Sequence, residues 1–351
     1  MIAPERAARR PRQCVERHHI QSLGLICHEL AEDLAGVSLA PLSLPPPGPG
    51  QALVRVGAAA LNFPDLLMTR GGYQFRPEPP FVIGMEGCGR VEALGQGVQG
   101  PWRVGDRVVF GGKTGACATH ALVPLDSLER APESLDDGQA AAYTVGASTA
   151  YASLVERAHL RAGQWLLVHG ASGGMGMAAA QLGIQLGAQV IATARNVAAH
   201  DTLRAMGVRA CLGTAAGLHE EVKQLTGGRG VDVVFDPVGG DMFDESMRAV
   251  CWGGTILIVG FTSGRIARMA TNHALIKNLA ILGVRAGEMQ RRDAGTGERI
   301  RAAIAGLAHA PGMAPVIGAR FPLERASEAL RALQSRSFIG KIVIENKTGD
   351  R

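Results

Sequence analysis

The chain has 351 residues, of which 46% are hydrophobic and 19% are charged, and its formal net charge is +5. This length leaves room for two domains of ordinary size, each with its own apolar core. No apolar run approaches the ~20 residues that span a membrane. The mild positive charge is not gathered into a basic stripe with interleaved aromatics, which argues against nucleic acid as a partner.

The first residues carry no pattern of a strand or a helix. The segment MIAPERAARRPRQCVERHH is rich in arginine, and the first plausible strand is Leu23–His28. We therefore predict that residues 1–22 form a flexible N-terminal extension.

The six cysteines are widely scattered, and none stands in a C-x-x-C pair. This usage indicates reduced thiols rather than a disulfide framework or a zinc site, so we expect a cytoplasmic protein. The cysteines are Cys14, Cys27, Cys88, Cys117, Cys211 and Cys251.

Short strands separated by glycine and proline turns dominate the chain up to about residue 147. Strand-like segments occur at Gln51–Gly57, Gly87–Leu94 and Asp106–Phe110, and turns such as Pro45–Gly48 separate them. This pattern is typical of a partly open antiparallel barrel rather than of a βαβ unit.

The stretch Trp165–Arg195 reads as strand, glycine turn, helix and strand, the opening unit of a dinucleotide-binding sheet. The three positions of the fingerprint G-x-G-x-x-G are filled here by Ala171, Gly173 and Gly176. Gly173 lets the backbone approach a pyrophosphate, Gly176 lets helix and strand pack closely, and the helix N-terminus offers free N–H groups to an anion. The alternative is a purely structural turn. The expected dinucleotide contacts are Ser172, Gly173, Gly174, Met175 and Gly176.

The second strand of this unit indicates NADPH as the cofactor. NAD sites usually carry Asp or Glu at this strand end to hold the ribose 2′-hydroxyl, whereas this strand ends in Ala194, Arg195 and Asn196. The planar guanidinium of Arg195 can pair with a 2′-phosphate, which a carboxylate would repel. The alternative is a solvated surface arginine.

Strands and helices alternate in the following part of the chain. Val231–Val238, Thr255–Phe261 and Ala280–Val284 are apolar runs suited to strands covered on both faces, and Asp241–Val250 is helical. Ligands bind beyond the carboxyl ends of parallel strands, so residues that follow these strands are expected to contact the cofactor rather than to be ordinary loop residues. They are Pro237, Val238, Gly239, Gly260, Phe261, Ser263 and Val284.

The C-terminal segment changes pattern again. Glu324–Leu333 is predicted to be a helix with one apolar face, and Gly340–Glu345 a closing strand.

Several short motifs follow one another in a characteristic order from about Gly24 to Glu345. They are Asn62–Asp65, Gly71–Tyr73, Pro80–Gly84, Val104–Val108, Thr149–Tyr151, Ala171–Gly176, Gly227–Asp232, Asp236–Gly240 and Gly340–Lys341. Together they resemble the medium-chain dehydrogenase/reductase superfamily, and within it the zinc-free NADPH:quinone oxidoreductase, or zeta-crystallin-like, branch.

The resemblance implies an α/β fold in which a doubly wound Rossmann sheet is inserted in a GroES-like β-barrel catalytic domain. The catalytic domain would cover residues 23–147 and 285–351 and the NADPH-binding Rossmann domain residues 148–284, with the active site in the cleft between them. The resemblance also implies a homodimer that transfers hydride from NADPH to a small electrophile.

The residues themselves argue against zinc. Zinc-dependent relatives carry Gly-His-Glu where this chain has Gly84-Met85-Glu86, and they carry a cysteine near the position of Asn62. Methionine and asparagine do not build a tetrahedral zinc site. We expect no metal, and we expect Met85 and Glu86 simply to pack at the wall of the cleft.

Four residues receive roles from the resemblance. It places Asn62 beside the nicotinamide as a catalytic and cofactor-binding amide, and it turns the Tyr73 hydroxyl toward the substrate, as a proton donor in the enoyl-thioester relatives. Thr149 and Lys341 are implied cofactor contacts. The alternatives are an Asn62 that only forms a turn and a Tyr73 that only packs on the substrate.

Other positions depart from the family pattern. A lysine and a tyrosine that often hold the adenosine phosphate are replaced by Ala199 and Thr214, so Arg195 has to do more of that work. Gly146 stands where the branch usually shows a threonine beside the nicotinamide. Arg285 replaces an aromatic or small residue, which would reshape the substrate end of the cleft.

Three functions stay open on this basis. The first is a zinc-independent, NADPH-dependent reductase of quinones or similar activated electrophiles. The second is a reductase of α,β-unsaturated carbonyls or enoyl thioesters with Tyr73 as proton donor. A coenzyme A thioester would need basic groups at the mouth of the cleft, which Arg70 and Arg76 could supply; the alternative is that both are ordinary surface arginines. The third is a non-enzymatic NADPH-binding protein that also binds nucleic acid, which the basic N-terminal segment allows but no stacking platform supports.

Overall fold

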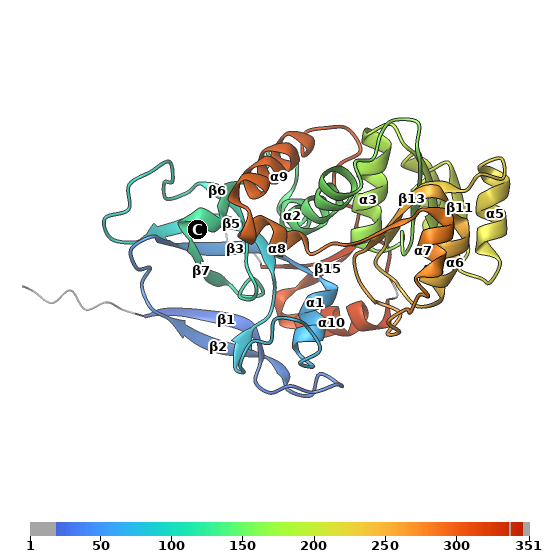
Figure 1. The fold of residues 1–351 in the computed structure, drawn as a ribbon. Helices are drawn as coiled ribbons and strands as arrows, with labels where there is room; N and C mark the ends of the chain where they lie inside the picture. The colour runs from blue at the N-terminus through green and yellow to red at the C-terminus, as the bar shows by residue number, and fades with distance from the viewer. Residues whose placement is uncertain (1–18, 337, 347–351) are drawn as a thin grey trace, which may run out of the picture.

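The computed structural model describes residues 19–336 and 338–346, which form two units (Figure 1). The segments before and after the central part of the chain together build a largely antiparallel unit, and the central part builds a parallel sheet with helices around it. This arrangement confirms the predicted fold class, a Rossmann-type sheet inserted in a GroES-like barrel domain. None of the helices in this described part is long and apolar enough to cross a membrane.

The antiparallel unit is centred on the long strand β3 (Gln51–Leu61), which pairs antiparallel with β5, β7 and β16. The seven-stranded sheet also contains β6, β8 and β15, and a separate three-stranded sheet lies beside it. The other strands are β5 (Glu86–Leu94), β6 (Arg107–Gly111), β7 (His120–Pro124), β8 (Leu128–Arg130), β15 (Ile317–Pro322) and β16 (Lys341–Glu345) in the large sheet, and β1 (Ile20–Cys27), β2 (Val37–Leu44) and β4 (Phe81–Val82) in the small one.

The first strand begins earlier than the sequence pattern suggested. Residues Ile20–Ser22 pair with Leu42–Leu44 of β2, so β1 starts at Ile20 and not at Leu23. The prediction of an extension over residues 1–22 is therefore wrong for these three positions, because their backbone groups are used in the sheet. Residues 1–18 lie outside the described residues.

The central sheet has six parallel strands in the order β11-β10-β9-β12-β13-β14. Leu166 and Leu167 of β9 are both fully buried but belong to two different core clusters, since alternate side chains point to opposite faces. Burial on both faces is why these segments read as continuous apolar runs. The strands are β9 (Trp165–Val168), β10 (Gln189–Thr193), β11 (Ala210–Leu212), β12 (Val231–Asp236), β13 (Val250–Ile258) and β14 (Ala280–Gly283).

The helices lie around these sheets (Figure 1). In chain order they are α1 (Phe63–Met68), the 3₁₀ turn η1 (Leu125–Ser127), α2 (Asp137–Tyr151) with its π-helical continuation η2 (Ala152–Arg157), α3 (Gly174–Gln185), α4 (Ala199–Ala205), α5 (Leu218–Leu225), α6 (Asp241–Ala249), α7 (Asn272–Lys277), α8 (Ala286–Arg292), α9 (Ala294–Leu307), the 3₁₀ turn η3 (Leu323–Arg325) and α10 (Ala326–Ser335). α1 and α10 pack together in the core of the antiparallel unit.

Two strand boundaries differ from those expected. β12 ends at Asp236 rather than at Val238, because the Asp236 carboxylate accepts hydrogen bonds from the backbone N–H groups of Val238 and Gly239, both at 2.8 Å. β13 begins at Val250 rather than at Thr255. Hydrophobicity located the strands, whereas a side-chain-capped turn set the end of β12.

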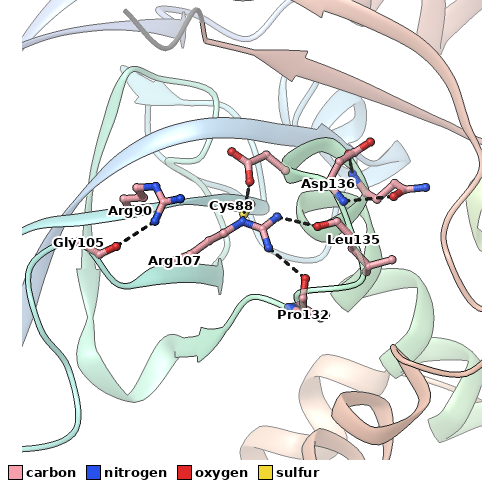
Figure 2. A network of polar contacts seen from close by, with 9 residues as sticks. Cys88, Arg90, Gly105, Arg107, Pro132, Leu135 and Asp136 are labelled. Atoms are coloured by element: carbon pink, nitrogen blue, oxygen red, sulfur yellow. Dashed lines mark hydrogen bonds and ion pairs between the residues drawn. The ribbon is translucent and has the colours of Figure 1, made fainter. Parts of the chain in front are cut away.

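Arg107 on β6 fixes the helix that leads from the barrel to the central sheet (Figure 2). Its guanidinium donates to Asp137 Oδ1 at 2.7 Å and to the backbone carbonyls of Pro132 at 3.0 Å and Leu135 at 2.8 Å. The Cys88 thiol donates to the same Asp137 oxygen, and burial together with that carboxylate raises its pKa to about 12. Asp137 is the first residue of α2, so these bonds hold the start of this helix.

Candidate active site

The glycine turn leads from β9 into α3. Gly173 is the N-cap of α3, and no side chain caps the free N–H groups of that end. A Cβ at Gly176 would lie 2.5 Å from the backbone oxygen of Gly170 and 2.8 Å from the Cα of Ala171. Only glycine permits this approach of helix to strand, as the dinucleotide fingerprint requires. Ser172 and Met175 are partly exposed beside the glycines.

A buried histidine directly before the glycine turn bonds to two neighbouring elements. His169 follows β9, is fully buried, and lies 3.0 Å from Thr193 Oγ1 and 2.7 Å from Ser246 Oγ through its two ring nitrogens. Burial lowers the pKa of its imidazole, so the ring is neutral near pH 7 and ties β9 to β10 and α6. No motif in the sequence points to this residue.

The loops after β12 and β13 lie against each other at the same sheet edge. Thr262 donates from its backbone N–H to the Pro237 carbonyl at 3.1 Å, and Ser263 to the Val238 carbonyl at 2.9 Å. Gly239 has a φ of 68°, and a Cβ there would lie 3.1 Å from the Phe261 ring. The structure therefore brings together the predicted contacts Pro237, Val238, Gly239, Gly260, Phe261 and Ser263.

The last strand brings the C-terminal segment onto the glycine turn. Gly340 donates from its backbone N–H to the Ser172 carbonyl at 2.8 Å and forms a β-bridge with Gly173. A Cβ at Gly174 would lie 2.3 Å from Cδ of Lys341, so the aliphatic stem of this lysine runs directly over the turn. The residues predicted at the turn and Lys341 are thus in direct contact.

The ammonium group of Lys341 lies in a closed ring of buried polar groups. It donates to Asn62 Oδ1 at 2.7 Å and to Glu86 Oε1 at 2.8 Å, and Asn62 Nδ2 donates to the same Glu86 oxygen at 2.9 Å. The second Glu86 oxygen accepts from the backbone N–H of Val145 in α2 at 2.9 Å. We had expected Glu86 only to pack at the wall of the cleft. Instead its carboxylate joins three segments of the chain.

A second buried carboxylate lies next to this ring. Asp65 is fully buried and accepts from the backbone N–H of Asn62 at 2.7 Å, which caps the start of α1. Burial raises the pKa of Asp65 to about 7, and the Glu86 charge acts in the same direction, whereas the Asn62 N–H and the Lys341 ammonium oppose it. Its other oxygen, Oδ1, has no hydrogen-bond partner among the described residues.

Two family models match the chain: the alcohol dehydrogenase GroES-like domain over residues 48–156 and the zinc-binding dehydrogenase domain over residues 174–304. A quinone oxidoreductase-like protein 2 homolog from Nematostella vectensis is 34% identical over 304 residues, which cover 86% of this chain and 83% of that protein. The chain belongs to the medium-chain dehydrogenase/reductase superfamily, in its quinone oxidoreductase branch.

Solved structures of this superfamily share the whole fold. A probable oxidoreductase from Mycobacterium abscessus superposes with a TM-score of 0.83 at 33% sequence identity, covering 93% of this chain and 99% of that one. A mycobacterial protein crystallised with NADPH gives a TM-score of 0.84 at 26% identity, covering 92% of this chain and 99% of that one. The chain is thus an oxidoreductase of a superfamily that binds nicotinamide cofactors.

The residues at the zinc position of this superfamily do not fit a zinc ion. Glu86 is already bonded through both oxygens to Lys341, Asn62 and the backbone of α2. A buried ammonium 2.8 Å from the carboxylate would repel a divalent cation at that place. Within residues 19–336 and 338–346, no group of three His, Cys, Asp or Glu side chains is arranged to hold a metal.

The glycine turn does fit a dinucleotide. A Cβ at Gly174 or Gly176 would clash with its neighbours, whereas at Gly173 it would lie 3.6 Å from the nearest atom; the uncapped N–H groups of α3 are free to bind an anion. On the adenosine side, Arg195 is exposed directly after β10. Ala199 is the first residue of α4 and is buried there, so it offers no charge. Thr214 is half-buried after β11.

Arg336 is a second basic residue near Arg195, and it was not predicted from the sequence. Its guanidinium lies 5.5 Å from the centre of the Phe63 ring and donates to the Thr262 carbonyl, so it touches both units. Partial burial and the positive charge of Arg195 lower its pKa, which places two guanidinium groups within electrostatic reach of each other. The signal in the sequence was a basic residue shortly before Gly340–Lys341, and only the fold relates it to Arg195.

The remaining predicted residues lie on different elements. Thr149 is half-buried on α2, and Gly146 one turn earlier packs against Ala178 of α3 beside a cavity of about 20 Å³, room for roughly one water molecule. Val284 is buried after β14 and donates from its backbone N–H to Ile258. Arg285 is largely exposed, 4.0 Å from Glu288.

Tyr73 lies in the loop after α1, half-buried against the core of the antiparallel unit. Among the described residues its hydroxyl has no hydrogen-bond partner. A buried tyrosine usually pairs its hydroxyl, so this one is free to meet a ligand or solvent.

Proposed function

We propose that this protein is a zinc-independent, NADPH-dependent reductase that delivers hydride to quinones or similarly activated electrophiles. The observation that carries the proposal is the contact of the glycine turn with Gly340–Lys341, which brings a diphosphate-binding helix N-terminus next to the buried Asn62–Glu86–Lys341 ring. This proximity supports a reductase site in which the turn holds the cofactor and the ring belongs to the catalytic domain.

The choice of NADPH rests on charge. Arg195 offers a guanidinium group after β10, where an NAD site would carry a carboxylate, and Arg336 lies within electrostatic reach of it. Two neighbouring guanidinium groups repel each other, and an anion that binds between them relieves this repulsion. The 2′-phosphate is such an anion. The mycobacterial neighbour crystallised with NADPH supports the same cofactor.

The residues of the chain bind and orient in this proposal. The N–H groups at the start of α3 and the glycine backbone would hold the diphosphate, and the loops after β12 and β13 would border the nicotinamide half. Bound NADPH supplies the hydride. The protein excludes water and keeps the acceptor aligned, since a nicotinamide cofactor carries the bond-making chemistry itself.

A second candidate is the reduction of α,β-unsaturated carbonyls or enoyl thioesters. The unpartnered hydroxyl of the half-buried Tyr73 favours it, because hydride addition to an enone leaves an enolate that needs one proton. In this candidate the Tyr73 O–H bond breaks, the proton goes to the α-carbon of the acceptor, and solvent restores the phenol.

One set of assays tests both candidates. NADPH oxidation is followed with 1,4-benzoquinone, 9,10-phenanthrenequinone, a 2-alkenal and crotonyl-coenzyme A, in the wild type and in Tyr73→Phe. Quinone turnover that is indifferent to Tyr73→Phe supports the first candidate, and enal or thioester turnover that collapses in this variant supports the second. Tight NADPH binding without turnover of any acceptor would overturn both and favour a binding protein.

The cofactor preference is tested separately with Arg195→Ala and Arg336→Ala. Loss of a charge-assisted hydrogen bond weakens binding by about 1.5–3 kcal/mol, so we expect each variant to lower the NADPH over NADH preference about tenfold or more. Arg331→Ala, an exposed arginine on α10, is the matched control. An unchanged preference in both variants would contradict phosphate recognition by these arginines.

We further propose that the protein is a homodimer of the cytoplasm. β14 is the last strand of the central sheet and pairs only with β13 within the described residues. Leu275 and Ile276, directly before it on α7, are 82% and 67% exposed, and Ile266 is 68% exposed. A free strand edge beside exposed aliphatic side chains suits a two-fold contact with a second copy. The cytoplasm fits the free thiols of the five described cysteines.

A further inference from the structure

Lys341 makes its contacts in both halves of the molecule. Its stem lies over Gly174 in the glycine turn, and its ammonium reaches Asn62 and Glu86 in the antiparallel unit. The side chain is 9% exposed and that of Glu86 is 1% exposed, so the ion pair is shielded from water. A lysine placed only to bind a cofactor phosphate would present its ammonium to the ligand, whereas this ammonium donates two of its three N–H bonds to protein groups.

The two charged partners fix the orientation of the Asn62 amide. A carboxylate only accepts hydrogen bonds and an ammonium only donates them, so Nδ2 must face Glu86 and Oδ1 must face Lys341. The second Nδ2 hydrogen points to the Ala60 carbonyl at 3.4 Å. Both amide hydrogens are therefore used inside the protein. One lone pair on Oδ1 is left to accept a further hydrogen bond.

We propose that Lys341 is a positioning residue, which couples the glycine turn to Asn62 and, with Glu86, presents Asn62 to the bound cofactor as a hydrogen-bond acceptor. The proposal rests on the proposed reductase function and assigns Lys341 a role different from direct cofactor binding. In this role Lys341 sets the alignment of the reacting groups, and a displacement of about 1 Å in such an alignment lowers the rate of the chemical step by roughly 10²-fold.

The buried Glu86–Lys341 ion pair is part of a larger set of hydrogen bonds that fixes Asn62. Glu86 also accepts from Val145 in the middle of α2, so the ring touches the helix that carries Gly146 and Thr149 toward the cofactor side. Asp65 holds the backbone N–H of Asn62 at 2.7 Å, so the amide is fixed from the main chain as well as from its side chain. Asn62 is thus held at every polar atom except the one lone pair.

The test compares Lys341→Met, Asn62→Ala and the double variant. If Lys341 acts through Asn62, each single variant lowers kcat about tenfold or more, and the double variant is no slower than the slower single variant. NADPH affinity, measured directly by fluorescence titration without an acceptor, changes less than about threefold in Lys341→Met. Lys223→Met on α5 is the control lysine, and we expect wild-type values from it.

A second pair of variants covers failure to fold. Lys341→Met alone leaves the Glu86 charge buried without a partner, so Glu86→Gln with Lys341→Met is measured beside it. This neutral pair is expected to fold and to keep NADPH affinity, yet to show the same low kcat, because the amide of residue 86 no longer requires a unique orientation of Asn62.

The outcomes separate this inference from the function on which it rests. A wild type that binds no NADPH or turns over no acceptor overturns both. A wild type that is active, with Lys341→Met variants that lose NADPH affinity but keep kcat, overturns the inference alone and makes Lys341 a cofactor ligand. Losses in kcat that multiply in the Asn62→Ala, Lys341→Met double variant also overturn it, because the two residues then act independently.

Discussion

Arg107 Nε lies 2.7 Å from Asp137 Oδ1, and through this contact the barrel holds the first residue of α2. The ion pair is partly exposed, at 21% for Arg107 and 46% for Asp137, so the pair alone contributes only about 0–1 kcal/mol. The bonds from the same guanidinium to the carbonyls of Pro132 and Leu135 add to this; the Pro132 carbonyl also accepts from the backbone N–H of Leu135 at 3.2 Å.

We expect Arg107→Met to lower the free energy of unfolding by about 2 kcal/mol, because two carbonyls lose charged donors. Urea unfolding at neutral pH measures this loss. Arg90→Met is the matched control on the neighbouring strand: its guanidinium is exposed and bonds only the Gly105 carbonyl, so a loss below about 0.5 kcal/mol is expected. Equal losses in both variants would show that Arg107 has no special role in holding α2.

The glycine turn gives a prediction on cofactor binding. A Cβ at Gly176 would meet the backbone of Gly170 and Ala171 at 2.5 and 2.8 Å, and backbone atoms cannot swing aside as a side chain would. Overpacking of this kind costs about 1–3 kcal/mol, so Gly176→Ala is expected to weaken NADPH binding about tenfold or more. Fluorescence titration with NADPH measures the change.

The control for this variant is Gly213→Ala after β11. A Cβ at Gly213 meets nothing within 4 Å, and this glycine is not among those with positive φ. We expect its NADPH affinity to equal that of the wild type. If Gly176→Ala bound NADPH as tightly as Gly213→Ala, the turn would not be the diphosphate seat.

The sequence predicted the local parts of this molecule well. β9, the glycine turn and α3 follow one another within a short stretch, so strand, turn and helix signals can be read together. Strand ends were less predictable, because β12 ends where the Asp236 side chain caps the turn and not where apolar residues stop.

The buried ring of the site could not be read from the sequence. Lys341 bonds to Asn62 and Glu86, from which it is separated by 279 and 255 positions, and no local pattern relates such distant residues. Glu86 was expected only to pack at the wall of the cleft, whereas its partners are the N-cap residue of α1, a backbone N–H of α2 and the first residue of β16. Arg336 was overlooked for the same reason, since its relation to Arg195 exists only across the fold.

Asp65 predicts how stability depends on pH. Its pKa is raised from 3.8 to about 7 in the folded protein, so the folded state binds the proton more strongly than the unfolded state does. Stability therefore falls as the pH rises from about 4 to about 7 and is constant with respect to this group outside that window. The full shift corresponds to about 4 kcal/mol.

Asp65→Asn is expected to remove this slope. The new amide oxygen still accepts from the Asn62 N–H, so the cap of α1 stays, while the buried charge is lost. Urea unfolding at pH 5 and pH 8 measures the difference between variant and wild type. Glu86 and Lys341 face the same carboxyl group and stay in place, so a slope that persists in Asp65→Asn would assign the effect to another group.

The proposed dimer depends on the free edge of the central sheet. Two copies that pair their β14 strands about a two-fold axis would cover each other's Leu275 and Ile276, which are 82% and 67% exposed in the single chain. A charge on this apolar surface would have to be buried without a partner, so Leu275→Asp with Ile276→Asp is expected to yield a monomer.

Sedimentation velocity at micromolar concentration measures the state of each variant. Val104→Asp is the matched control, since Val104 is 66% exposed but lies in the antiparallel unit, away from the sheet edge. The control is expected to sediment as a dimer, like the wild type. A wild type that sediments as a monomer would overturn the proposed dimer. If the Leu275, Ile276 double variant stays a dimer, the contact lies on another face of the molecule, because two buried aspartates would not be tolerated in this one.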